Sequence, residues 1–200
     1  MLFILTIAIF SYVIHECAHG VVAVWCGDAT PQSEHRITMD PRNHVSLWGS
    51  VVSPLLFLTL RLPPLGWIKR VPLNKYNLRN PRHDIVWISL AGSCANLAVA
   101  SILSLVNRFI PPGFFLHQMV SYAGYFNVFL ALIHLIPLPP LDGWEAAKGM
   151  VSYTVAKRME HIEVYRFAMI AGFVFLGGFN RIVMPWSSML GTILGFDRLF

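Results

Sequence analysis

The sequence predicts an all-α integral membrane protein, a polytopic helical bundle with about four transmembrane helices and one re-entrant segment. Its 200 residues are 56% hydrophobic and 12% charged, whereas soluble domains are about 45–50% apolar and about 25% charged. The apolar residues also gather in runs close to the roughly 20 residues that cross a bilayer as a helix. The length suits one compact domain, residues 1–200.

The apolar runs give the expected elements in order. They cover residues 2–26, 46–62, 84–107, 118–138 and 162–184, with a shorter run at 186–196. The first run lacks a small-residue cleavage site, so we expect a retained span rather than a signal peptide. Pro-Pro pairs mark the connections because proline lacks an amide proton and ends regular helix. We expect a short strand or loop region near residues 30–45.

The run at 46–62 is short for a span and contains Pro54. If it re-enters and returns, eleven of the basic residues in the connections share one side and Arg108 lies opposite. If it crosses, the division falls to nine against three. Because basic connections face the cytoplasm, the first arrangement is the better topology. The sequence therefore predicts re-entry at 46–62.

The formal net charge of +5 does not indicate a nucleic-acid partner. The basic residues lie in short connections instead of along one helix or face, which suits topology signals at a lipid bilayer. The cysteines, Cys17, Cys26 and Cys94, are odd in number and lack paired spacing, so we expect neither a disulfide framework nor a thiolate metal site.

His15, Glu16 and His19 form an H-E-x-x-H pattern inside the first apolar run. Residues four apart lie on one helical face, so both imidazoles can bind one zinc ion while Glu16 takes a proton from bound water. Ionisable residues at the centre of a span each cost about 2.5–3.5 kcal/mol on insertion scales and need a partner or a function. The pattern predicts a zinc hydrolase with Glu16 as general base.

Two histidines leave a catalytic zinc without its usual third protein ligand. Asp142 is a candidate because it follows the proline-rich end of the run at 118–138 and precedes Gly143, which permits a close turn. An Asp-Gly pair is also typical of an ordinary turn or helix start, so residue chemistry alone leaves both interpretations open.

The chain resembles the site-2 protease family of intramembrane zinc metalloproteases, in particular its small members without added domains. The resemblance lies in an ordered set of motifs: H-E-x-x-H, then Gly27-Asp28-Ala29-Thr30, Arg36 to Pro41 with His44, Gly66-Trp67, Val71-Pro72-Leu73-Asn74, Ala91-Gly92 with Asn96, and Pro137 to Gly143. It implies one zinc ion held by His15, His19 and Asp142, with Glu16 as general base. Such a site requires the first run and 118–138 to run parallel, which re-entry at 46–62 permits.

Two further residues are tentative site residues. Asn96, in the middle of the run at 84–107, is able to bond the oxyanion of the reaction or to bridge two helices. His134 stands where the family has Asn, and Ser93 where it has Pro. We expect His134 to face the site, where it donates to the substrate backbone, acts as an extra zinc ligand, or bonds a carbonyl as a core histidine.

The predicted function is zinc-dependent hydrolysis of peptide bonds in or near the transmembrane segments of membrane-protein substrates. We expect a multi-pass protein of the cell membrane with its site toward the cytoplasm. The substrate must unwind, and the loop at 30–41 or the re-entrant segment is a candidate strand edge for it. A membrane zinc carrier or sensor, which would not need Glu16, and a proteolytically inactive scaffold are the alternatives.

Overall fold

The computed structural model describes residues 2–59 and 68–196, which form helices and connections without a strand. The longer helices are α1 (Leu2–Trp25), α4 (Pro81–Asn107), α5 (Phe115–His134), α6 (Asp142–Met150), α7 (Tyr153–Ile162), α8 (Arg166–Phe175) and α9 (Met184–Ile193). The shorter ones are α2 (Thr30–Ser33), η1 (Pro41–Asn43), η2 (Leu47–Val52), α3 (Ser53–Thr59), η3 (Lys75–Asn77), η4 (Glu163–Tyr165) and η5 (Phe179–Val183).

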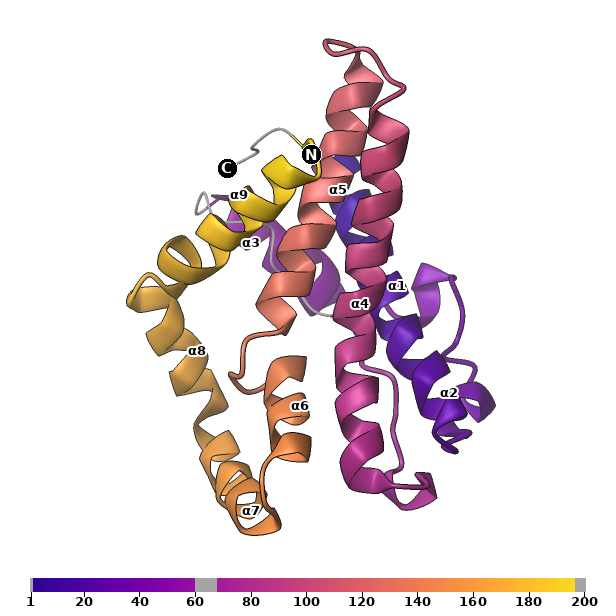
Figure 1. Cartoon of the computed structure of the whole chain (residues 1–200), viewed down its shortest axis with the longest axis vertical. Helices are drawn as coiled ribbons and strands as arrows, with labels where there is room; N and C mark the ends of the chain where they lie inside the picture. Colours follow the sequence, from indigo (N-terminus) through magenta and orange to yellow (C-terminus); the bar gives the residue numbers. More distant parts are fainter. Residues whose placement is uncertain (1, 60–67, 197–200) are drawn as a thin grey trace.

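Helices α1, α4 and α5 form the central bundle (Figure 1). In Figure 1, α1 and α5 both run downward, whereas α4, which lies between them in the sequence, runs upward. Helices α1 and α5 are therefore parallel, as predicted. Apolar side chains of α1 and α5 make the main core, in which Val13, Phe129 and Leu130 have no exposed surface. This arrangement brings the second half of α1 toward the end of α5.

Polar side chains connect the bundle helices inside the core. Ser93 Oγ donates to the Ala131 carbonyl at 3.1 Å, and Asn107 Nδ2 donates to Ser121 Oγ at 2.9 Å, so two bonds link α4 to α5. Such bonds are a common device between membrane helices. Ser93, which stands in place of the family's proline, thus has a structural partner.

The predicted four transmembrane helices are only partly found. Two helices, Phe3–Trp25 and Pro81–Asn107, are long and apolar enough to cross a membrane, and the number reaches three if a bent helix pair is counted as one span. That pair joins Tyr153–Phe175 to Phe179–Ile193 at an angle of 62°. The apolar run at 162–184 is therefore not one straight helix, because Gly177 adopts a φ of 74° that no regular helix permits.

Re-entry of the run at 46–62 stays a prediction, and the described part of the run is a short helical segment. Residues 47–59 form η2 and α3, and the apolar helix Leu47–Leu56 is too short to span a bilayer. The Lys69 amide donates to the His44 carbonyl at 2.7 Å. The residues just before the segment therefore lie beside those just after it. Residues 60–62 of the prediction lie outside the described part of the chain.

A strand in the region 30–45 is not found. Residues 30–33 form α2, residues 41–43 form η1, and the intervening chain is irregular. The loop is stabilised by side chains: Asp40 accepts from the Arg42 amide at 3.0 Å, and buried His44 Nε2 donates to the Thr38 carbonyl at 2.9 Å. The loop backbone is held by these side-chain hydrogen bonds and not by pairing with a neighbouring strand.

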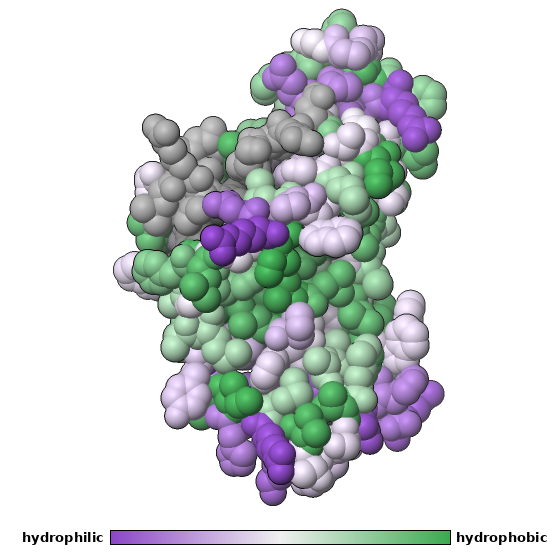
Figure 2. Space-filling model, turned by 60° about the vertical axis from the view of Figure 1, so that its left-hand side comes forward, coloured by the Kyte–Doolittle hydropathy of each residue, from purple (hydrophilic) through white to green (hydrophobic). Residues whose placement is uncertain are grey.

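Figure 2 shows the face turned toward the viewer as a broad hydrophobic belt, interrupted by a hydrophilic group, between ends where hydrophilic residues gather. A belt of this kind suits the hydrocarbon layer of a bilayer, whose thickness is about 30 Å. The fold thus has the surface expected of a membrane protein.

Candidate metal centre

His15 and His19 lie one helical turn apart in the second half of α1 and face the bundle interior. Their ring centroids are 4.8 Å apart, and both side chains are buried. The H-E-x-x-H spacing produces this arrangement because residues four apart share a helical face. The two imidazoles can therefore approach one metal ion together.

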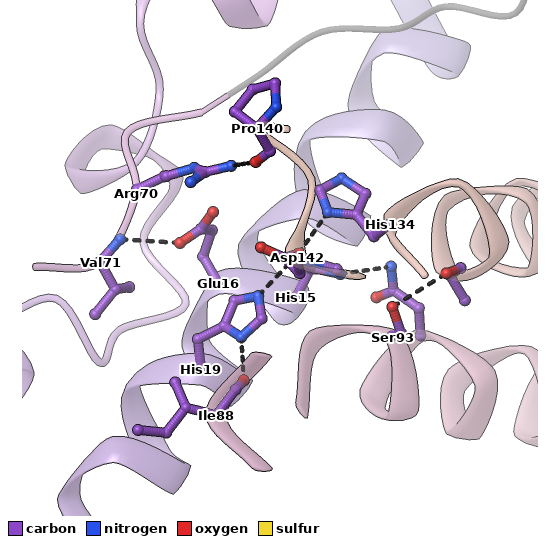
Figure 3. Close-up of polar contacts among 12 residues, drawn as sticks. His15, Glu16, His19, Arg70, Val71, Ile88, Ser93, His134, Pro140 and Asp142 are labelled. Carbon is purple, nitrogen blue, oxygen red and sulfur yellow. Dashed lines mark hydrogen bonds and ion pairs between the residues drawn. The ribbon is translucent and has the colours of Figure 1, made fainter. Parts of the chain in front are cut away.

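Asp142 reaches the histidines from the other side through a sharp change of chain direction. Helix α5 ends at His134, a proline-rich connection follows, and Asp142 is the first residue of α6. A Cβ on Gly143 would lie 2.3 Å from the Leu135 carbonyl oxygen, so only glycine allows this close return. Arg70 donates to the Pro140 carbonyl, and this hydrogen bond links the connection between α5 and α6 to the chain beside Val71 (Figure 3).

The Asp142 carboxylate lies against both histidines. Its Oδ2 is 2.9 Å from His15 Nε2 and 3.4 Å from His19 Nε2. One ligand atom from each residue lies within 4.8 Å of the others, so the three are able to hold one metal ion. Ligand atoms in a tetrahedral zinc site with bonds near 2.1 Å are about 3.4 Å apart, close to the 2.9 and 3.4 Å that separate Asp142 Oδ2 from the two histidine nitrogens.

The buried polar atoms of His19 also fit a metal. Its Nδ1 donates to the Ile88 carbonyl at 2.5 Å, which leaves Nε2 as the free nitrogen. Nε2 is buried, and among the described residues it faces the Asp142 carboxylate at 3.4 Å without a hydrogen bond. Buried polar atoms are rarely left unpaired without a functional reason. Two imidazole nitrogens and one carboxylate oxygen are the donor set that zinc takes in hydrolases.

Glu16 lies beside this group on the next position of α1. Its Oε2 accepts from the Val71 amide at 2.9 Å, and the side chain interacts electrostatically with His19 and Asp142 (Figure 3). Glu16 as a whole residue is 9% exposed. The amide fixes one carboxylate oxygen and leaves Oε1 to exchange a proton.

The two tentative residues both meet the group. His134 Nδ1 lies 2.5 Å from Asp142 Oδ2, and its ring centroid is 4.2 Å from that of His15. His134 thus faces the site, as expected, with a hydrogen bond to Asp142 that was not among the three predicted roles. Asn96 Nδ2 lies 3.2 Å from His15 Nδ1, the ring nitrogen turned away from Asp142.

Sequence reasoning missed three contributors to the site. The Ile88 carbonyl, the Val71 amide and Arg70 act through backbone or long-range contacts that a residue pattern does not reveal. A usable signal existed for α4, since Ile88, Gly92 and Asn96 recur every four residues and so share one face.

Known proteins with similar sequences agree with a zinc site. The chain is 31% identical over 170 residues to the protein named "Putative zinc metalloprotease YwhC" of Bacillus subtilis, which covers 80% of this chain and 74% of that protein. It is 30% identical over 151 residues to "Putative zinc metalloprotease Rip2" of Mycobacterium tuberculosis, covering 72% of this chain and 56% of that protein. It is 24% identical to the Rip2 of Mycolicibacterium smegmatis over 183 residues, covering 90% of this chain and 70% of that protein.

No protein-family model and no solved structure matches the chain. The relation to YwhC nevertheless extends over most of both proteins, and the three residues that can hold a metal ion meet as a zinc site requires. The chain is a zinc metalloprotease and belongs to the site-2 protease family.

Proposed function

We propose that the chain is an intramembrane endopeptidase that hydrolyses peptide bonds in or near the transmembrane segments of membrane-protein substrates. One observation carries the proposal: both histidines are buried between helices, Asp142 is 15% exposed beside them, and two of the helices, α1 and α4, are apolar enough to cross a membrane. A peptide bond that reaches His15 and His19 must therefore approach within the bilayer. Regulated cleavage of membrane-bound signalling proteins fits such a site.

In this proposal His15, His19 and Asp142 hold one zinc ion, and Glu16 is the general base. Zinc, when bound, acidifies a coordinated water and polarises the scissile carbonyl. Glu16 accepts a proton from water at Oε1, while the Val71 amide keeps Oε2 in place. The same oxygen then passes the proton to the leaving nitrogen, so Glu16 ends the cycle deprotonated.

His134 supports the ligand Asp142 in this proposal. The 2.5 Å contact lets the imidazole N–H donate to the carboxylate, which holds its orientation toward the histidines. Hydrogen-bonded partners behind metal ligands typically raise metal affinity about 10–100-fold.

We also propose that the site faces the cytoplasmic side of the cell membrane. Basic residues meet at one end of α4, where Arg82 Nε donates to the Gly149 carbonyl at 3.2 Å and Lys75 lies 3.7 Å from Glu145. Arg108 follows the opposite end of this 27-residue helix, about 40 Å away at a rise of about 1.5 Å per residue. Basic connections favour the cytoplasm.

The test compares the wild type with Glu16→Gln, both purified and loaded with one equivalent of zinc, on a panel of single-span membrane proteins. We expect the wild type to cut within or beside the span and Glu16→Gln to be slower by about 10²–10⁴-fold, the usual contribution of general acid–base catalysis. Equal cleavage by Glu16→Gln would refute the assignment of the base. Zinc transport into liposomes without proteolysis would favour a carrier, and bound zinc without turnover an inactive scaffold.

A further inference from the structure

Three successive turns of α4 lie against the two histidines of α1. Ile88 accepts from His19 Nδ1 at 2.5 Å, Gly92 lies under the His15 ring, and Asn96 lies beside His15 Nδ1 at 3.2 Å. A Cβ on Gly92 would come within 2.5 Å of His15 Nε2, so the ring packs directly on the α4 backbone. Both histidines are thus positioned by one face of a single neighbouring helix.

Metal binding through Nε2 determines the protonation state of Nδ1 on each imidazole ring. A neutral imidazole that binds a metal through Nε2 carries its proton on Nδ1, and this proton needs an acceptor. For His19 the acceptor is the Ile88 carbonyl. For His15 the neighbour at Nδ1 is the Asn96 amide, which contains both a donor and an acceptor.

The proton that a zinc-bound His15 carries on Nδ1 decides between the two orientations of the Asn96 amide. With Nδ2 toward His15, Asn96 Oδ1 is buried and has no hydrogen-bond partner in residues 2–59 and 68–196. In this orientation Nδ2 would also meet the Nδ1 proton of a zinc-bound His15, so two donors would face each other. A half turn of the amide places Oδ1 at His15 Nδ1, and the two amide atoms are interchangeable in shape.

We propose that Asn96 is a positioning residue for the zinc ligand His15, with Oδ1 accepting the Nδ1–H hydrogen bond. Asn96 acts through His15 and not on the substrate. The proposal rests on His15 being a zinc ligand, as proposed above. It replaces the oxyanion role expected from the sequence, because an oxyanion donor would have to face the reacting carbonyl and Asn96 lies behind the ring. The other expected role, a bond between two helices, is found, since the contact with His15 joins α4 to α1.

Burial supports this position. Asn96 and His15 both have no exposed surface, so no substrate backbone reaches Asn96 without displacing the ring. The contact joins α1 to α4 at a sequence separation of 81 residues. At His19 the Ile88 carbonyl of α4 accepts the Nδ1–H hydrogen bond, so α4 supplies such an acceptor to one of the two histidines.

The test measures zinc affinity, because catalysis alone would not separate a positioning role from an oxyanion role. The metal-stripped protein in detergent is titrated with zinc against a chromophoric chelator. Asn96→Leu, which has no acceptor, is expected to bind zinc about 10–100-fold more weakly. Asn96→Asp keeps an acceptor at the same distance and is expected to remain within about threefold of the wild type, since carboxylates commonly serve ligating histidines.

Asn107→Leu is the matched control, since Asn107 is a buried asparagine on the same helix that bonds Ser121 and no histidine. It should lower thermal stability without changing zinc affinity. Unchanged zinc affinity in Asn96→Leu with slower cleavage would overturn the proposal in favour of an oxyanion role. Equal weakening in Asn96→Leu and Asn107→Leu would reduce Asn96 to a helix bridge. If the wild type binds no zinc, the ligand assignment of His15 fails first.

Discussion

The site depends at the residue scale on which atoms of each side chain remain free. His19 donates through Nδ1 to Ile88, so only Nε2 points at Asp142. Glu16 has one oxygen fixed by the Val71 amide. These contacts restrict the side chains before a substrate arrives, which is the general requirement for a preorganised catalytic site.

His134 is, with Ser93, one of the residues at which this chain departs from the family pattern. We predict that His134→Ala lowers zinc affinity about tenfold because Asp142 loses the hydrogen bond that orients it. His134→Asn should retain most of the affinity, since an amide also donates. Competitive zinc titration measures both. Full affinity together with lower activity in His134→Ala would instead favour contact with the substrate.

At the element scale, the close packing of α1 on α4 sets the position of His15. We predict that Gly92→Ala displaces the ring and weakens zinc binding at least about tenfold, because the new Cβ would lie 2.5 Å from Nε2. Gly172→Ala in α8 is the control, since a Cβ there meets nothing within 4 Å. It should leave zinc affinity unchanged and stabilise the helix by up to about 1 kcal/mol. Equal zinc affinity in both variants would show that the ring has room to move.

The connection after α1 is held by one buried carboxylate. Asp28 accepts from Thr30 Oγ1 at 2.6 Å, the Asn74 amide at 2.7 Å and Asn77 Nδ2 at 3.0 Å. Burial raises the pKa of Asp28, but these hydrogen bonds outweigh it and hold the pKa below its usual 3.8. The ionised carboxylate therefore fixes the loop that follows Val71.

We predict that Asp28→Asn lowers the free energy of unfolding by about 2 kcal/mol, because the bond from the Asn74 amide is lost. Since the folded pKa is depressed, this contribution is present above 3.8 and is lost as the pH falls through the lower folded value. Thermal unfolding of both proteins between about pH 3 and pH 7 tests it. A stability difference that does not shrink at acid pH would contradict the assignment.

At the scale of the whole molecule, the residues that share a helical face could be predicted from the sequence, but the path of the chain through its proline-rich and glycine-rich breaks could not. The H-E-x-x-H pair follows from helix geometry alone, and parallel α1 and α5 follow from the need to bring Asp142 to it. The contact between His134 and Asp142 could not be derived because prolines unwind the chain between them. The break at Gly177 was missed, although the Gly177-Gly178 pair, followed by Asn180 and Arg181, interrupts the apolar run there.

The return of the segment after His44 determines the topology of the whole chain. If residues 46–62 crossed the bilayer, α1 and α5 would run antiparallel, and Asp142 could not reach His15 at 2.9 Å. The hydrogen bond from Lys69 to the His44 carbonyl likewise keeps both ends of the segment together. We therefore predict that residues 42 and 75 lie on one side of the membrane and Arg108 on the other.

Single cysteines at Arg42, Lys75 and Arg108, all exposed positions, test this topology in a variant whose native cysteines are replaced by serine. A membrane-impermeant maleimide applied to oriented vesicles should label Arg42→Cys and Lys75→Cys from the cytoplasmic side and Arg108→Cys from the other. Each variant is also labelled after detergent lysis, which shows that its thiol reacts once the barrier is removed. Labelling of Arg42→Cys together with Arg108→Cys would make the segment a crossing, and the charge division would then fall from eleven against one to nine against three.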